Sequence, residues 1–164
     1  MKLATLREPL AGSTRAVRVD DAGLVDLGFP DVGALLTQPD WAELASRDGD
    51  RSDADGARFA ALLPRPGKIV CVGLNYRGHI LEMGRELPEY PTLFAKYAEA
   101  LIGSTDDIWL APESDAVDWE AELAVVIGRR VRRASESQAE AAIAGFSVLD
   151  GVTMRDWQNR TAMW

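Results

Sequence analysis

Residues 119–129, WEAELAVVIGR, decide the fold class, because they carry the strongest strand signal in the chain. The run Leu123–Ile127 is continuously apolar, a pattern typical of a strand that is buried on both faces. A strand of this kind belongs inside a sheet. The sequence therefore predicts a β-rich core that is built around this segment.

The flanking segments predict further short strands and helices. Downstream, Ser135 and Gln138 have the spacing of a capping box for a helix that ends at Gly145, and a strand is expected at Phe146–Leu149. Upstream, a helix is expected at about 78–84, and strands are expected at 68–72, 92–96 and 107–110. The expected fold class is mainly β with short helices (α+β).

The first part of the chain predicts a small β domain. Its short strands and helical pieces are expected at 2–7, 15–19, 24–27, 32–36 and 41–45. Residues 46–56, SRDGDRSDADG, contain a single apolar residue, and their composition makes them the best candidate boundary. The segment Leu63–Gly67 then leads into the strand at 68–72. Composition therefore predicts that a second domain begins after residues 46–56.

Composition excludes several classes of function. The 164 residues carry a formal net charge of -8, which argues against a nucleic-acid-binding protein, because phosphate contacts need clustered lysine and arginine. No apolar run of about 18 residues is present, so no membrane span is expected. The charged N-terminal segment does not resemble a signal peptide.

The scarcity of cysteine and histidine narrows the chemistry further. Cys71 is the single cysteine, so the chain has no internal disulfide, and a reducing cytoplasm is expected. Within the run IVCVG, Cys71 is expected to be buried filler. His79 is the single histidine, so a divalent-metal site would consist largely of carboxylates. Such a site favours Mg²⁺ or Mn²⁺ over Zn²⁺.

Glu120 and Glu122 are the first candidates for such a site. They lie two residues apart at the start of the strand, so both side chains project from one face. Two carboxylates about 5–7 Å apart repel each other unless a cation lies between them. The alternative interpretation is a solvated outer face at the start of the strand.

His79 and Glu82 form a second candidate pair. They lie three residues apart on the expected helix, so they share a face, and a carboxylate there would orient the imidazole of a general base. The alternative is a capping or packing histidine.

The third candidate group follows the last expected strand and contains Asp150, Arg155, Asp156 and Gln158. A carboxylate here would be a third metal ligand, and Arg155 and Gln158 would hold an anionic substrate rich in oxygen. The alternative is an Arg155–Asp156 surface pair at the start of a helix.

Four blocks of the chain resemble the fumarylacetoacetate hydrolase family, in the order and spacing of that family. They are KIVCVGLNYRGHILEMG (68–84), YPTLFAKY (90–97), LIGSTDDIWLAPESDAVDWEAELAVVIGRR (101–130) and FSVLDGVTMRDWQNRT (146–161). The resemblance runs from about residue 68 to the end. It implies a small N-terminal domain at residues 1–66, followed by a mixed β-sandwich roll, the catalytic domain, at residues 67–164.

The resemblance also implies roles for individual residues. Glu120 and Glu122 match two of three carboxylates that bind Mg²⁺ or Mn²⁺, and His79 with Glu82 matches a dyad that activates water or moves a proton. Arg155 and Gln158 fall where the family contacts its substrate.

The family acts on small β-dicarbonyl and keto acids, so the implied activity is the metal-dependent hydrolysis of a C–C bond in an acylpyruvate-type acid. Isomerisation of a dienedioate or decarboxylation of oxaloacetate on the same scaffold is an alternative. A catalytically inactive binding module is another. The resemblance further implies a homodimer.

The chain departs from the family pattern in two places. Gly151 stands where the family has the third metal ligand, and Asp150, one residue earlier, would reach the metal only through a bulge or loop, because a shift of one residue on a strand reverses the face. The chain also stops at Trp164, before a lysine-containing GK(S/T)F segment of the family. The catalytic domain is therefore expected to be incomplete at its C-terminus.

Overall fold

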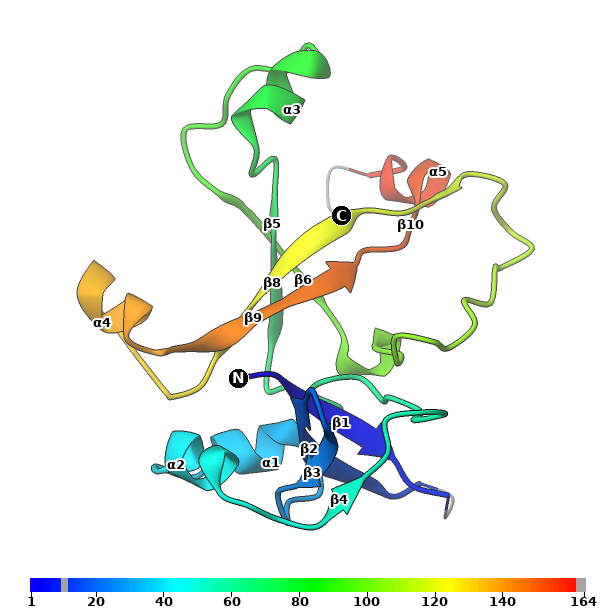
Figure 1. Ribbon diagram of the computed structural model, residues 1–164. Helices are drawn as coiled ribbons and strands as arrows, with labels where there is room; N and C mark the ends of the chain where they lie inside the picture. The colour runs from blue at the N-terminus through cyan, green and yellow to red at the C-terminus, as the bar shows by residue number, and fades with distance from the viewer. Residues whose placement is uncertain (10–11, 162–164) are drawn as a thin grey trace.

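The computed structural model describes residues 1–9 and 12–161, arranged as two adjoining parts (Figure 1). The first part holds β1 Leu3–Arg7, β2 Thr14–Asp20, β3 Gly23–Asp26, α1 Val32–Leu36, α2 Trp41–Ser46 and β4 Arg51–Ser52. The second part holds β5 Ile69–Gly73, α3 Arg77–Glu82, β6 Thr92–Lys96, η1 Ala98–Ala100, β7 Val117–Asp118, β8 Ala121–Ile127, α4 Glu136–Glu140, β9 Ile143–Asp150, β10 Thr153–Met154 and α5 Arg155–Gln158. The predicted mainly β class with short helices is confirmed. Among the residues described, no helix is both long enough and apolar enough to cross a membrane.

The first part is an antiparallel sheet with the strand order β1-β2-β3-β4. Leu6, Val17 and Leu24 form its core cluster, and α1 contributes the buried Val32 and Leu35. Burial of these apolar side chains is the main favourable term for folding of this part.

Two residues within the segment 46–56 join this sheet, so the expectation of a boundary there is wrong. Arg51 and Ser52 form β4 and pair with β3, and the chain then returns to the sheet, where Phe59 bridges to Leu6. A short, solvent-facing edge strand has the same polar composition as a linker, which explains the error. The division at residues 66 and 67 stays a prediction.

Polar contacts join the two parts. Arg7 of the first part forms an ion pair with Asp106 of the second. The Arg7 guanidinium and, above all, the Gly103 N–H hold the pKa of Asp106 below its ordinary value. A Cβ on Gly103 would collide with the Phe59 carbonyl, so only glycine fits this junction.

Asp31 is expected to be the most sensitive polar residue of the first part. Its buried side chain caps α1 by accepting from the Ala34 N–H at 2.7 Å, and it also accepts from Arg65 at 3.1 Å. Asp31→Ala should lower the free energy of unfolding by about 1–2 kcal/mol, because it removes the cap and a charge-assisted bond. Urea unfolding followed by circular dichroism measures the change. Arg65→Ala, at an 81% exposed side chain, should cost about 0.5 kcal/mol or less. Equal losses of unfolding free energy in the two variants would contradict the assignment of Asp31 as the helix cap of α1.

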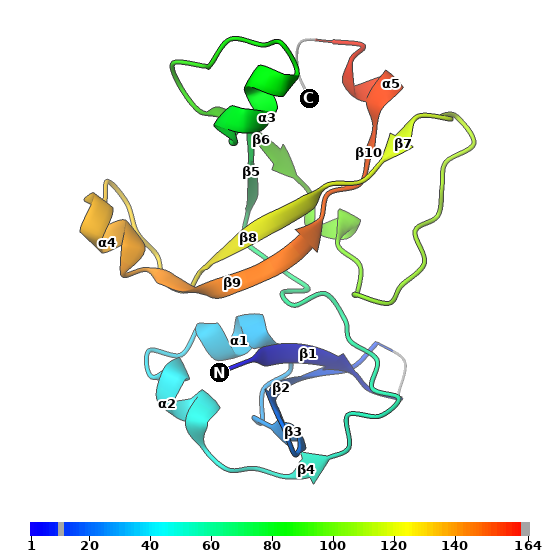
Figure 2. The same ribbon diagram turned by 45° about the horizontal axis from the view of Figure 1, so that its top comes forward.

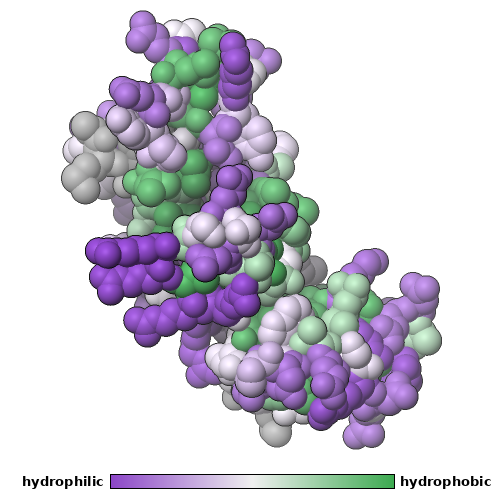
Figure 3. Space-filling view, turned by 90° about the vertical axis from the view of Figure 1, so that its left-hand side faces the viewer, coloured by the Kyte–Doolittle hydropathy of each residue, from purple (hydrophilic) through white to green (hydrophobic). Residues whose placement is uncertain are grey.

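The second part is built around two antiparallel pairs of strands, β5–β6 and β8–β9, whose connections contain α3 and α4 respectively (Figure 2). One face of each is half-buried, and the other is exposed. The exposed face of β8–β9 carries Leu123, Val125, Phe146 and Val148. In a space-filling view, apolar residues reach the surface in the middle of the molecule (Figure 3). The prediction that Leu123–Ile127 is buried on both faces is therefore wrong. Among the residues described, β8 pairs only with β9, and no element covers its outer face.

Two predicted elements differ in the structure. Asp107–Leu110 forms no strand, and Trp109 there is 91% exposed. The helix after the capping box ends at Glu140, not at Gly145. Gly145 instead pairs with Val126 in the β8–β9 ladder, because pairing with a distant strand overrides a local stop signal. The capping box itself is confirmed.

Candidate active site

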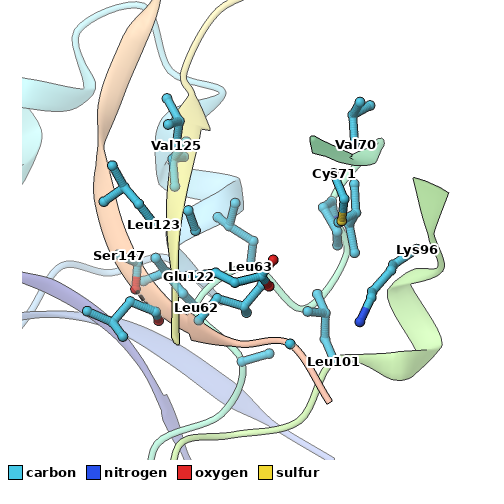
Figure 4. A pocket seen from close by; sticks show the side chains of 18 of the residues that line it. Leu62, Leu63, Val70, Cys71, Lys96, Leu101, Glu122, Leu123, Val125 and Ser147 are labelled. Atoms are coloured by element: carbon cyan, nitrogen blue, oxygen red, sulfur yellow. Dashed lines mark hydrogen bonds between the residues drawn. The ribbon is translucent and has the colours of Figure 1, made fainter. Parts of the chain in front are cut away.

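Residues of both strand pairs, β5–β6 and β8–β9, line a broad, open cleft (Figure 4). Glu122 enters it from β8, and Lys96 and Cys71 enter it from the β5–β6 side. Leu62, Leu63 and Leu101 supply apolar lining. The cleft thus combines apolar walls with opposite charges, which is the ordinary composition of a site for a small polar ligand.

Glu120 and Glu122 differ in their surroundings. Glu120 lies just before β8, whereas Glu122 lies within it, opposite Leu149 and half-buried. Burial raises the pKa of Glu122, and the nearby Glu120 charge raises it further. Lys96 acts in the opposite direction. Glu122 therefore does not lie on a solvated outer face, which was the alternative interpretation of this pair.

The guanidinium of Arg155 lies beside the Glu120 carboxylate. It forms an ion pair with the Glu120 carboxylate and contacts Asp118 Oδ2 at 2.9 Å, and its Nη1 donates to Gln158 Oε1 at 3.0 Å. Hydrogen bonding to Arg155 lowers the pKa of Asp118, and bonding to Glu120 raises the pKa of Arg155. Asp156 accepts instead from the Ser114 hydroxyl at 2.6 Å. The Arg155–Asp156 pair weighed from the sequence is thus replaced by contacts with distant residues.

Asp150 and Gly151 face opposite sides of the sheet. Asp150 pairs with Ala121 and is exposed, on the face opposite to Glu122. The Gly151 N–H donates to the Glu120 carbonyl at 2.9 Å. A Cβ on Gly151 would lie 2.8 Å from the Glu122 carboxyl carbon. The position that faces the carboxylates therefore carries no side chain.

The carboxylates present do not complete a three-ligand metal site. Over residues 1–9 and 12–161, no group of three or more His, Cys, Asp or Glu side chains is placed to hold a metal ion. Glu120 and Glu122 are ligands of the hard type that Mg²⁺ and Mn²⁺ prefer, but Arg155 already neutralises Glu120. The donor set fits such an ion only in part.

His79 and Glu82 share a face of α3, as their spacing predicts. His79 Nδ1 lies 4.0 Å from Glu82 Oε2, and both side chains are largely exposed. The turn into α3 holds Leu74 at φ 51°, a left-handed conformation that is uncommon for a residue with a side chain. His79 lines the same cleft as Glu122 and Arg155. Among the described residues, no hydrogen bond or ion pair joins the His79–Glu82 pair to the Glu120–Glu122 pair.

Lys96 and Asp118 are site residues that the sequence analysis missed. Lys96 lies on the half-buried face of β6 with Phe94 and donates to the Val152 carbonyl at 3.4 Å. Alternation along Thr92–Lys96 could have placed it there, because it shares a face with Phe94. No local sequence pattern indicates a role for Asp118, because its partner Arg155 lies 37 residues away in the chain.

Comparison with known proteins identifies relatives of the second part above all. Residues 68–164 match the family model described as fumarylacetoacetate (FAA) hydrolase, C-terminal. The chain is 49% identical over 100 residues to the mitochondrial oxaloacetate tautomerase FAHD2A of Bos taurus, and the match covers 61% of this chain and 32% of that protein. It is 42% identical over 150 residues to the mitochondrial oxaloacetate tautomerase of Xenopus laevis, covering 85% of this chain and 47% of that protein.

Solved structures match the whole arrangement. The 5-carboxymethyl-2-hydroxymuconate delta-isomerase of Mycobacterium smegmatis superposes with a TM-score of 0.76 at 25% identity, covering 100% of this chain and 60% of that one. The 2-hydroxyhepta-2,4-diene-1,7-dioate isomerase of Mycobacterium marinum superposes with a TM-score of 0.70 at 25% identity, covering 100% and 59%. The chain spans 32–47% of the length of the two curated relatives above.

Proposed function

Because the chain belongs to the fumarylacetoacetate hydrolase family, we propose that it moves a proton at the carbon next to the keto group of a small anionic keto acid. The observation that carries this proposal is the His79–Glu82 pair on α3, where Nδ1 lies 4.0 Å from Oε2. His79 and Lys96 are both among the residues that line the broad cleft. Relatives named oxaloacetate tautomerase and dienedioate isomerase support a proton-transfer reaction.

Each residue has a defined part in this proposal. In the keto-to-enol direction, His79 takes the proton from carbon, Glu82 stabilises the imidazolium that forms, and the keto oxygen gains a proton from water. In the enol-to-keto direction, the enol hydroxyl loses its proton to water and the imidazolium gives a proton to carbon. Lys96 attracts the substrate carboxylate into the cleft. Gln158 accepts from Arg155 through Oε1, so its amide N–H groups serve as donors to a substrate oxygen. Arg155 is held by Glu120 and Asp118, so we assign it to orienting Gln158 rather than to direct substrate contact.

Divalent-metal use is general in this family, and we propose Glu120 and Glu122 as the side chains through which Mg²⁺ or Mn²⁺ would bind in this chain. A hard cation there would polarise keto and carboxylate oxygens of the substrate. The incomplete ligand set predicts weak binding, since affinity follows the number of charged ligands.

We also propose a homodimer in a reducing compartment such as the cytoplasm. The exposed apolar face of β8–β9, which includes Leu123 and Val148, supports association, because large exposed apolar surfaces generally mark interfaces.

The experiment follows three reactions with one protein. We expect the chain to accelerate the decay of enol-oxaloacetate, measured by ultraviolet absorbance, by about two orders of magnitude, the ordinary contribution of a positioned base. His79→Ala should lose this acceleration. Pyruvate release from oxaloacetate would indicate a decarboxylase, and cleavage of an acylpyruvate would indicate a C–C hydrolase. Substrate binding without any turnover would indicate a binding module.

A further inference from the structure

Arg155 lies where the carboxylate pair needs a positive charge. Its guanidinium contacts Glu120 and Asp118 together, and its side chain is 33% exposed. Without a cation, the Glu120 and Glu122 carboxylates would repel each other across the start of β8. Arg155 removes that repulsion at Glu120, and Lys96 acts on Glu122 from the other side of the cleft.

A third carboxylate at residue 151 would favour a metal ion over the Arg155 guanidinium, but residue 151 is a glycine and has no side chain. Gly151 faces Glu122, and the nearest acidic neighbour in sequence, Asp150, faces the outer side of the sheet. A hard divalent cation would therefore find two carboxylates, of which one is already paired with an arginine.

We infer that Arg155 is the resident cation of this site and competes with a divalent metal ion for Glu120. The inference rests on the proposed ligands Glu120 and Glu122, but not on the proposed reaction. A metal ion that binds Glu120 must displace the guanidinium or share the carboxylate with it, and either route costs part of the Arg155 contact. The metal-free chain is thus the electrostatically satisfied form.

The helix that carries Arg155 has other attachments, so the residue can be replaced without releasing α5. The Arg155 backbone N–H donates to the Ala116 carbonyl at 2.8 Å. Ser114 donates to Asp156 at 2.6 Å, and the Trp157 indole donates to the Glu113 carbonyl at 3.3 Å. None of these bonds uses the guanidinium.

Arg155→Gln tests the competition directly. Binding of Mn²⁺ is followed by the loss of the electron paramagnetic resonance signal of the free ion, with no substrate present. We expect Arg155→Gln to bind Mn²⁺ about tenfold more tightly than the parent chain, a change of about 1.4 kcal/mol. The variant should unfold at a lower temperature without metal and recover on addition of Mn²⁺, because a ligand stabilises the state that binds it. Arg130→Gln, an exposed arginine on the β8–α4 connection, removes the same charge and should change neither quantity.

Unchanged or weaker Mn²⁺ binding in folded Arg155→Gln would overturn the inference. If that variant does not fold, the parent chain provides the second measurement. Titration with Mg²⁺ should then shift the Arg155 Nε–H nuclear magnetic resonance signal, and a signal that stays fixed while Mg²⁺ binds would overturn it equally. Failure of the enol assay with tight Mn²⁺ binding in Arg155→Gln would refute the proposed reaction and leave the competition intact.

Discussion

The double exchange Asp150→Asn with Gly151→Asp is expected to tighten Mn²⁺ or Mg²⁺ binding at least about tenfold, because it adds a third charged ligand to a hard-cation site. The Gly151 backbone faces the Glu122 carboxylate, so a side chain there would point at the proposed ligands. Removing the Asp150 charge at the same time keeps the net charge constant. Isothermal titration calorimetry on the full chain measures the change.

The backbone at residue 151 accepts a side chain. Its φ lies outside the left-handed region, and the atoms that the new Cβ would approach are the far end of the flexible Glu122 side chain. Glu122 must rotate away slightly, and three neighbouring carboxylates without a cation repel one another. The exchanged variant should therefore unfold at a lower temperature than the parent in a chelator and at a higher one with Mn²⁺.

Two controls isolate the position. Asp150→Asn alone should not tighten metal binding, because Asp150 is exposed on the opposite face and its negative charge acts on Glu122 only through space. Gly67→Asp adds a carboxylate in open space before β5 and should also have no effect. If the double exchange binds no more tightly than the parent, Asp150 already reaches the cation through a shifted backbone, and the assignment of faces to residues 150 and 151 is wrong.

The sequence predicted local structure well where the signal was local. The strand Thr92–Lys96 and the helix Val32–Leu36 have the bounds that periodicity indicated, and Ser135 caps its helix as expected. The errors arose where a distant partner decides the outcome. Glycine often ends a helix, yet Gly145 lies in β9 and pairs with Val126 of β8. Residues 51–52 resemble a linker, yet they pair with β3.

In the candidate site too, local contacts could be predicted from the sequence and long-range contacts could not. The shared face of His79 and Glu82 follows from helical spacing, and the structure places them 4.0 Å apart. The partners of Arg155 could not be read from spacing, because Glu120 lies 35 residues before it. Its neighbour Asp156 was the natural guess for an ion pair. Long-range pairing of charges depends on register between strands, and the sequence gives no measure of that register.

The loss expected from the His79–Glu82 pair is the largest effect on turnover. His79→Ala and Glu82→Ala should each lower the kcat for enol-oxaloacetate by about 100-fold or more, the range seen for a positioned general base. The double variant should lose little beyond the larger single loss, because Glu82 acts only through the imidazole. Spectrophotometric rates at saturating substrate, with circular dichroism to verify folding, measure these losses.

Because His79 and Glu82 are exposed, this experiment separates a loss of catalysis from a loss of folding. Both side chains are largely exposed on α3, while Ile80 on the same helix is buried, so truncation to alanine should leave the packing of α3 in place. Glu86→Ala, an exposed carboxylate four residues beyond Glu82, is the matched control and should retain full turnover. Glu82→Gln keeps the shape but not the charge, and since the charge stabilises the imidazolium, it should lose nearly as much as Glu82→Ala. If the two single losses multiply in the double variant, His79 and Glu82 act independently, and proton transfer by a histidine–carboxylate unit is the wrong mechanism for this cleft.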